Sequence, residues 1–129
     1  MTRTELKKLH NLECKNIQWS WAFVNHEENF IVVQVFSEQN KNKVYSPTWG
    51  KKTQPSHKEF KEYLDLVTEH DYDIKVVQAT GYLDTDTNTF RLTGYNGKTL
   101  FNARLEIDSN REVWFYPAKD GVEKISSKD

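Results

Sequence analysis

The sequence predicts an α+β fold: a curved, mostly antiparallel sheet of about six strands, barrel-like in its most closed form, with two helices packed on it. Two segments carry apolar residues at helical spacing, and several short segments are rich in β-branched and aromatic residues. The resulting order is α-β-β-α-β-β-β-β. With 129 residues in all, we expect one domain over residues 1–118 and a polar C-terminal tail over residues 119–129.

The first helix is expected at residues 2–11. Thr2 and Glu5 have the spacing of a capping box, in which each side chain bonds the other residue's backbone N–H. Leu6 and Leu9 follow at helical spacing, so one face of this short helix is apolar.

The second helix, residues 56–70, has the clearest pattern in the chain. Pro55 precedes Ser56 and Glu59, which again have capping-box spacing. Apolar residues then recur at i, i+3, i+4 and i+7, namely Phe60, Tyr63, Leu64 and Val67.

Two strands are expected between the helices, at residues 18–25 and 30–37. In the first, Trp19, Trp21 and Phe23 alternate and should form one aromatic stripe. The second is apolar on both faces and should be central in the sheet, with Gln34 as its only polar interior residue.

Four further strands are predicted in the C-terminal half. Asn96-Gly97 is the strongest short hairpin signal in the chain, and Pro117 should end the last strand. The expected strands cover residues 74–80, 90–95, 100–107 and 112–116.

A long polar connection, residues 38–55, separates the second strand from the second helix. Connections of this length are often functional. Tyr45 and Trp49 interrupt its polar sequence, and lysines dominate the region from residue 40 to 61, where Glu59 is the only acid. Such asymmetry is typical of an anion-binding face, and a solvated loop is the alternative.

Composition argues against several classes of protein. The chain has no apolar run of the ~20 residues that span a bilayer, no apolar N-terminal signal, and one cysteine, Cys14. These features predict a cytoplasmic protein without membrane association. Histidines and acids lack metal-ligand spacing, so we expect neither a metal nor a cofactor. Only Asp73 and Lys75, which resemble part of a nuclease motif, keep an enzymatic role open.

The remaining candidate function is the recognition of a ligand by binding. Aromatic side chains stack on bases and lysines bind phosphates. Core packing is the expected role of Trp19 and Trp21, whereas Trp49 is the better candidate for ligand contact. The proposed stacking residues are Trp19, Trp21, Tyr45 and Trp49; the hydrogen-bonding residues are Asn16, Ser20 and Gln34; the phosphate contacts are Lys43, Lys51 and Lys52.

The chain resembles a small bacterial domain associated with restriction-type and HNH nucleases that act on modified DNA. The resemblance is carried by residues 15–22, 31–36, Trp49 and 56–70, followed by Tyr72 and residues 74–79. The resemblance covers roughly residues 12–116, and the His-Asn-His metal site of those nucleases has no counterpart in it. The resemblance therefore implies the recognition part without the cleaving part. Proteins that read modified bases often extrude the base into an aromatic pocket.

Two functions are consistent with these patterns. The first is a nucleic-acid recognition module that reads a modified base in a restriction or defence context. The alternative is a small protein-interaction or regulatory domain, such as a phage or defence accessory, that docks on a partner protein through its aromatic loop. The oligomeric state is left open.

Overall fold

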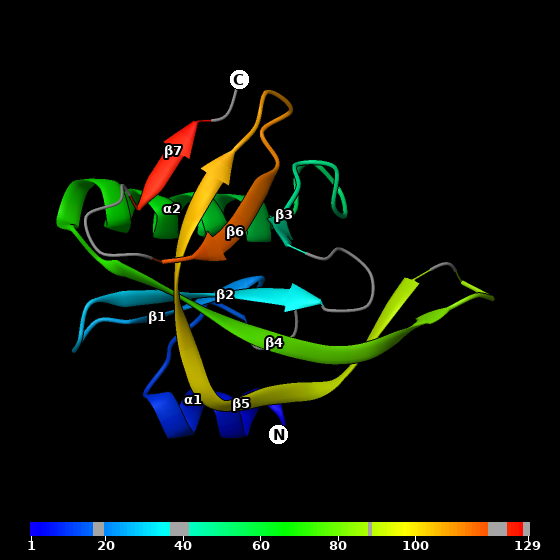
Figure 1. Cartoon of the computed structure of the whole chain (residues 1–129). Coiled ribbons are helices and arrows are strands. Elements are labelled where there is room, and N and C mark those ends of the chain that lie inside the picture. The colour runs from blue at the N-terminus through cyan, green and yellow to red at the C-terminus, as the bar shows by residue number, and fades with distance from the viewer. Residues whose placement is uncertain (17–19, 37–41, 88, 119–123, 128–129) are drawn as a thin grey trace.

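The computed structural model describes residues 1–16, 20–36, 42–87, 89–118 and 124–127, and it confirms the α+β class (Figure 1). Two helices accompany a strongly curled, mostly antiparallel half-barrel sheet. The helices are α1 (Arg3–His10) and α2 (Pro55–His70). The strands are β1 (Ala22–Asn25), β2 (Phe30–Phe36), β3 (Lys43–Tyr45), β4 (Asp73–Asp84), β5 (Thr89–Ile107), β6 (Val113–Pro117) and β7 (Ile125–Ser127).

The strands are hydrogen-bonded in the order β1-β2-β4-β5-β6-β3, and β7 pairs with β5. β2 and β4 are parallel because the chain crosses back through α2 between them. The long strand β5 curls the sheet, since its first part pairs with β4 and its last part with β6 (Figure 1).

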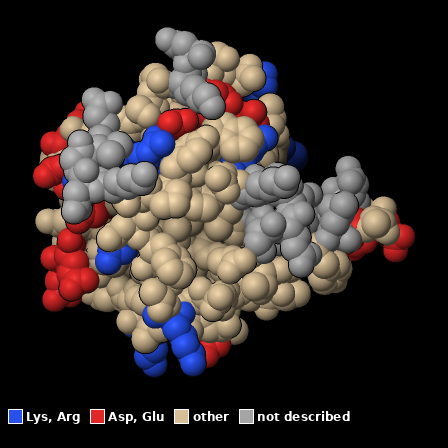
Figure 2. Space-filling view, viewed as in Figure 1, with Lys and Arg blue, Asp and Glu red and all other residues tan. Residues whose placement is uncertain are grey.

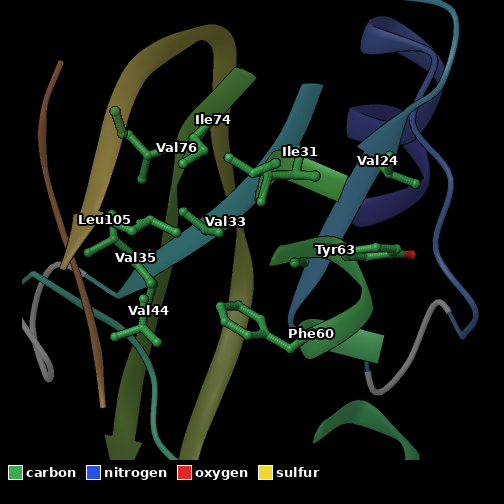
Figure 3. Close-up of a cluster of buried hydrophobic side chains, with 14 residues drawn as sticks. Val24, Ile31, Val33, Val35, Val44, Phe60, Tyr63, Ile74, Val76 and Leu105 are labelled. Atoms are coloured by element: carbon green, nitrogen blue, oxygen red, sulfur yellow. The ribbon is translucent and has the colours of Figure 1, made fainter. Parts of the chain in front are cut away.

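Each face of the sheet has its own apolar core, and one helix covers each face. Phe60 and Tyr63 of α2 pack against Ile31, Val33 and Val35 of β2 (Figure 3). On the opposite face, Leu6 of α1 packs in a smaller core made by Leu12, Phe23, Phe30, Val32, Val77, Ala79 and Tyr95. Burying each large apolar side chain stabilises the fold by ~1.5–3 kcal/mol. β2 contributes to both cores and lies between β1 and β4, so it is an interior strand, as its two apolar faces predicted.

The first helix confirms its predicted cap. Thr2 and Glu5 form both hydrogen bonds of a capping box. The N-terminal amino group of Met1 donates to the Tyr95 carbonyl oxygen at 2.9 Å, and the Tyr95 N–H donates back to the Met1 carbonyl oxygen at 2.7 Å. The start of the chain is therefore attached to the middle of β5.

The predicted hairpin at Asn96-Gly97 is wrong, because β5 continues through both residues. Asn96 lies opposite Gln78 and Phe101 opposite Val76, so residues 97–100 bulge against the single residue between. Gly97 meets α1 there: a Cβ on it would overlap the Leu6 side chain. The glycine allows close helix packing and does not form a turn.

The second helix begins differently from the prediction. Gln54 is its N-cap residue, without a side-chain cap hydrogen bond, and Pro55 is the first residue of the helix. Glu59 is buried instead of capping: its carboxylate accepts the Lys15 N–H at 2.6 Å and the Tyr63 hydroxyl at 2.8 Å. Burial, followed by the hydrogen bond to Glu59, raises the pKa of Tyr63 far above its ordinary value.

The aromatic stripe is also corrected. β1 begins only at Ala22, and Trp21 lies in a bend before it. Trp21 packs against the core under α2, whereas Phe23 belongs to the core under α1. Alternation therefore does not extend from Phe23 back to Trp21, and Trp19 lies outside the described residues.

Two short strands lie where none was predicted. β3 falls within the connection 38–55, and β7 falls within the predicted tail. β7 pairs in parallel with the end of β5, and Ile125 packs against the α2-side core. Neither segment has enough apolar residues to signal a strand alone. Among the described residues, no helix combines the length and apolarity needed to cross a membrane.

Candidate nucleic-acid interface

Four rings from separate parts of the chain meet at the start of α2. We call Trp21, Tyr45, Trp49 and His57 the aromatic cluster. The Trp21 ring centroid lies 5.6 Å from that of Trp49, 5.7 Å from that of Tyr45 and 4.8 Å from that of His57. Three of the aromatic residues proposed from the sequence are therefore neighbours, although up to 28 positions separate them.

Tyr45 links the aromatic cluster to the core. Its ring stacks on Phe60 with centroids 4.4 Å apart and planes 9° from parallel. Its hydroxyl lies 2.6 Å from His57 Nδ1, and burial raises the pKa of Tyr45. These contacts fix the ring on a rigid helix, while Trp21, Tyr45 and Trp49 each remain partly exposed.

His57 has one satisfied and one unsatisfied nitrogen. Within the described residues, Nε2 is the only buried side-chain nitrogen or oxygen without a hydrogen-bond partner. The Trp21 ring lies edge-on to the imidazole at 79°. The cluster therefore holds a buried polar atom that no described residue pairs with.

The lysines beside the aromatic cluster are exposed. Lys51 and Lys52 lie in the loop between Trp49 and α2, and neither makes an ion pair within the described part of the chain. Lys51, Thr53, Gln54 and Pro55 line a hollow of about 360 Å³ at the start of α2. No acidic residue lies in the first turn of α2, so the positive end of its dipole adds to the lysine charges.

Lys43 does not join this group. Its ammonium pairs with Glu112 at 2.7 Å and lies 5.0 Å from the centre of the Trp114 ring. The fold already compensates this charge, so the predicted phosphate contact is not free for a ligand.

The predicted hydrogen-bonding residues have internal roles. Gln34 is buried on the α1 side of the sheet: its Oε1 accepts from the Tyr95 hydroxyl at 2.5 Å, and its Nε2 donates to the Ser20 carbonyl at 3.2 Å. Ser20 is buried as well, and its hydroxyl oxygen accepts the Asn16 N–H at 3.1 Å. These bonds hold the connection before β1, and they use the Gln34 amide and the Ser20 hydroxyl inside the fold.

Sequence reasoning missed a cleft on the α2 side of the sheet. Its volume is about 760 Å³, within the range of small-molecule sites. No charged residue lines it among those described, and Figure 2 shows a broad uncharged surface across the middle of this view. The lining residues are Val35, Asn42, Val76, Gln78, Phe101, Asn102, Phe115, Pro117 and Ala118.

One signal in the sequence could have indicated this cleft. Gln78 follows Ile74 and Val76 on one face of its strand, where an apolar residue would continue the core. A polar residue at such a position marks the edge of the core or a wall of a site.

The residues that kept an enzymatic role open have structural partners. Asp73 pairs with Lys124 at 3.1 Å, and the Lys75 ammonium lies 4.5 Å from the centre of the Phe30 ring. Nowhere in the described ranges do three or more His, Cys, Asp or Glu side chains gather as a metal site would require.

Comparisons of the chain with protein-family models, with curated proteins and with solved structures gave no match.

Proposed function

We propose that this chain is a nucleic-acid recognition module that binds a single strand at the start of α2. Bases stack on the exposed parts of Trp21, Tyr45 and Trp49, and Lys51 and Lys52 bind the phosphates. The observation that carries the proposal is the meeting of these aromatic rings beside two exposed lysines that make no ion pair among the described residues.

The energetics of stacking fit this arrangement. A base stacked on an aromatic side chain contributes ~1–3 kcal/mol without regard to sequence. Each lysine–phosphate contact adds a term that weakens as salt rises, because bound counterions are released. Rings held by Phe60 and by one another lose little freedom on binding.

Binding of a fluorescently labelled single-stranded oligonucleotide tests this proposal. Trp49→Ala should weaken binding about fivefold or more, as expected for one lost stacking partner. Tyr82→Ala is the matched control, because Tyr82 is 54% exposed on the β4–β5 hairpin away from the cluster. Equal affinities of the natural chain, Trp49→Ala and Tyr82→Ala for the oligonucleotide would contradict the proposal. Absence of binding by the natural chain at low salt would contradict it as well.

The finer form of the proposal is a reader of a modified base in a restriction or defence context, and it rests on the sequence resemblance. Oligonucleotides that differ only in cytosine, 5-methylcytosine or 5-hydroxymethylcytosine test this form. We expect the modified strand to bind more tightly, and equal binding of all three would leave only a general nucleic-acid module.

The alternative, a protein-interaction domain, uses the same partly exposed rings. A partner protein whose binding is insensitive to salt and is lost in Trp49→Ala, together with no oligonucleotide binding, would favour that alternative.

A further inference from the structure

We propose that the cleft of about 760 Å³ binds one base of the strand, with the faces of the base on Phe101 and Phe115 and its edge against the Gln78 amide. This inference rests on the proposed function and gives it a second, base-specific subsite. The expected ligand is a neutral, flat heteroaromatic ring, a purine or a pyrimidine.

The two phenylalanines supply the stacking surfaces. Phe101 lies opposite Val76 and Phe115 opposite Leu105, so both rings are on the α2 side of the sheet. Phe101 is 59% exposed, which is unusual for a large apolar residue in a strand. Within the described residues no ring contact joins the two phenylalanines, although both line the cleft.

The Gln78 amide supplies the polar edge. Gln78 lies opposite Val35 and is half-buried, and within the described residues its side chain makes no hydrogen bond. The buried Gln34, in contrast, has partners for both amide atoms. A coplanar donor and acceptor match the edge of a base. Gln78 lines the cleft and is only half-buried, so its amide is accessible to a ligand.

The surroundings select a neutral group. Val35 and Val76 form an apolar floor, and no lysine, arginine, aspartate or glutamate lines the cleft among the described residues. A phosphate or a carboxylate would be desolvated there without a countercharge. The charged part of the ligand therefore belongs at Lys51 and Lys52 and the uncharged base in the cleft.

β3 connects the two subsites. Asn42, immediately before β3, lines the cleft, and Tyr45 at the end of β3 belongs to the aromatic cluster. Three strand residues span roughly 10 Å. A strand of a few nucleotides can therefore reach both places.

Titration with free adenosine and cytidine, followed by NMR of the ¹⁵N-labelled chain, tests the cleft separately from the lysines. Nucleosides lack phosphate, so their binding does not need Lys51 or Lys52. We expect saturable shifts of the Gln78 side-chain amide and of backbone amides near Phe101. D-ribose should cause none, and equal shifts with ribose would overturn the inference.

Two variants and a control make the test specific. Phe101→Ala and Gln78→Leu should each weaken nucleoside binding about fivefold or more. Leu92→Ala, at a residue 40% exposed on the same strand but outside the cleft, should leave binding unchanged. Shifts confined to Trp21 and Trp49, or variants with unchanged affinity, would overturn the inference.

The two proposals fail in different ways. Salt-dependent oligonucleotide binding without nucleoside shifts in the cleft would remove the base subsite and keep the proposed function. Nucleoside binding in the cleft without oligonucleotide binding would support the subsite and remove the strand-binding function.

Discussion

Tyr45, at the end of β3, contacts both α2 and the loop before it: its ring stacks on Phe60 and lies edge-on to Trp49, and its hydroxyl hydrogen-bonds to His57. The sequence alone was enough to predict a site role for this ring, because a tyrosine in a polar loop is unusual. Its partners could not be predicted in the same way, since they come from elements whose meeting depends on the whole fold.

The Tyr45 hydroxyl should stabilise the fold. Tyr45→Phe leaves His57 with two nitrogens that lack a hydrogen-bond partner, so we expect the free energy of unfolding to fall by ~1–3 kcal/mol. Urea denaturation measures this change. Tyr82→Phe removes an exposed hydroxyl and is the control, with an expected change below ~0.5 kcal/mol. If Tyr45→Phe lowered the free energy of unfolding no more than Tyr82→Phe does, the hydrogen bond between Tyr45 and His57 would not stabilise the fold.

Asp108 should make stability depend on acid pH. The Trp114 Nε1–H, followed by the backbone N–H groups of Glu112 and Asn110, holds the pKa of its carboxyl below the ordinary value of 3.8. The folded state therefore prefers the charged form. Its stabilising effect is complete above the ordinary pKa and is lost as pH falls through the lower, folded-state pKa.

Asp108→Asn tests this dependence, because an amide keeps an acceptor oxygen but does not titrate. Denaturation series from about pH 6 down to about pH 2 should show a smaller loss of stability in the variant than in the natural chain. Parallel pH profiles would exclude a contribution of Asp108 to acid unfolding.

At the scale of elements, local patterns predicted what local forces determine. The cap of α1 and the apolar face of α2 follow from neighbouring residues, and both are confirmed. Glu59 and Gly97 were misassigned because each matches a local motif yet serves a distant contact, with Lys15 and with Leu6. Gln34 also serves a distant contact, because its acceptor oxygen binds the hydroxyl of Tyr95, 61 positions away.

The packing of α1 on β5 should depend on Gly97. Gly97→Ala places a methyl group against the Leu6 side chain, and overpacking of this kind typically costs ~1–3 kcal/mol. Asn96→Ala, at the exposed neighbour, should change stability by less than ~0.5 kcal/mol. Thermal or urea unfolding distinguishes the two, and equal stability would mean that α1 shifts without cost.

At the scale of the whole molecule, the C-terminal segment completes the sheet. The Leu105 N–H donates to the Lys124 carbonyl oxygen at 2.8 Å, and the Lys124 ammonium pairs with Asp71 and Asp73 at 2.9 and 3.1 Å. The segment thus covers an edge of β5 and links the end of β5 to the start of β4.

Ending the chain after Ala118 should therefore destabilise the fold by ~1–3 kcal/mol, mainly through loss of the Ile125 contacts and the β7 hydrogen bonds. Ending it after Ser127 keeps β7 and is the control. Identical unfolding curves for the two truncated proteins would contradict a structural role for β7.

The most direct test of strand binding is the salt dependence of single-stranded oligonucleotide affinity, measured by fluorescence anisotropy from about 50 to about 300 mM salt. The double variant Lys51→Ala/Lys52→Ala should flatten the slope of log affinity against log salt by about 1.4, or ~0.7 for each lost phosphate contact. The control is Lys8→Ala/Lys98→Ala, which removes the same charge at and beside α1, on the opposite side of the sheet. We predict that the control has the same slope as the natural chain. Equal slopes for the two double variants would contradict strand binding at the start of α2.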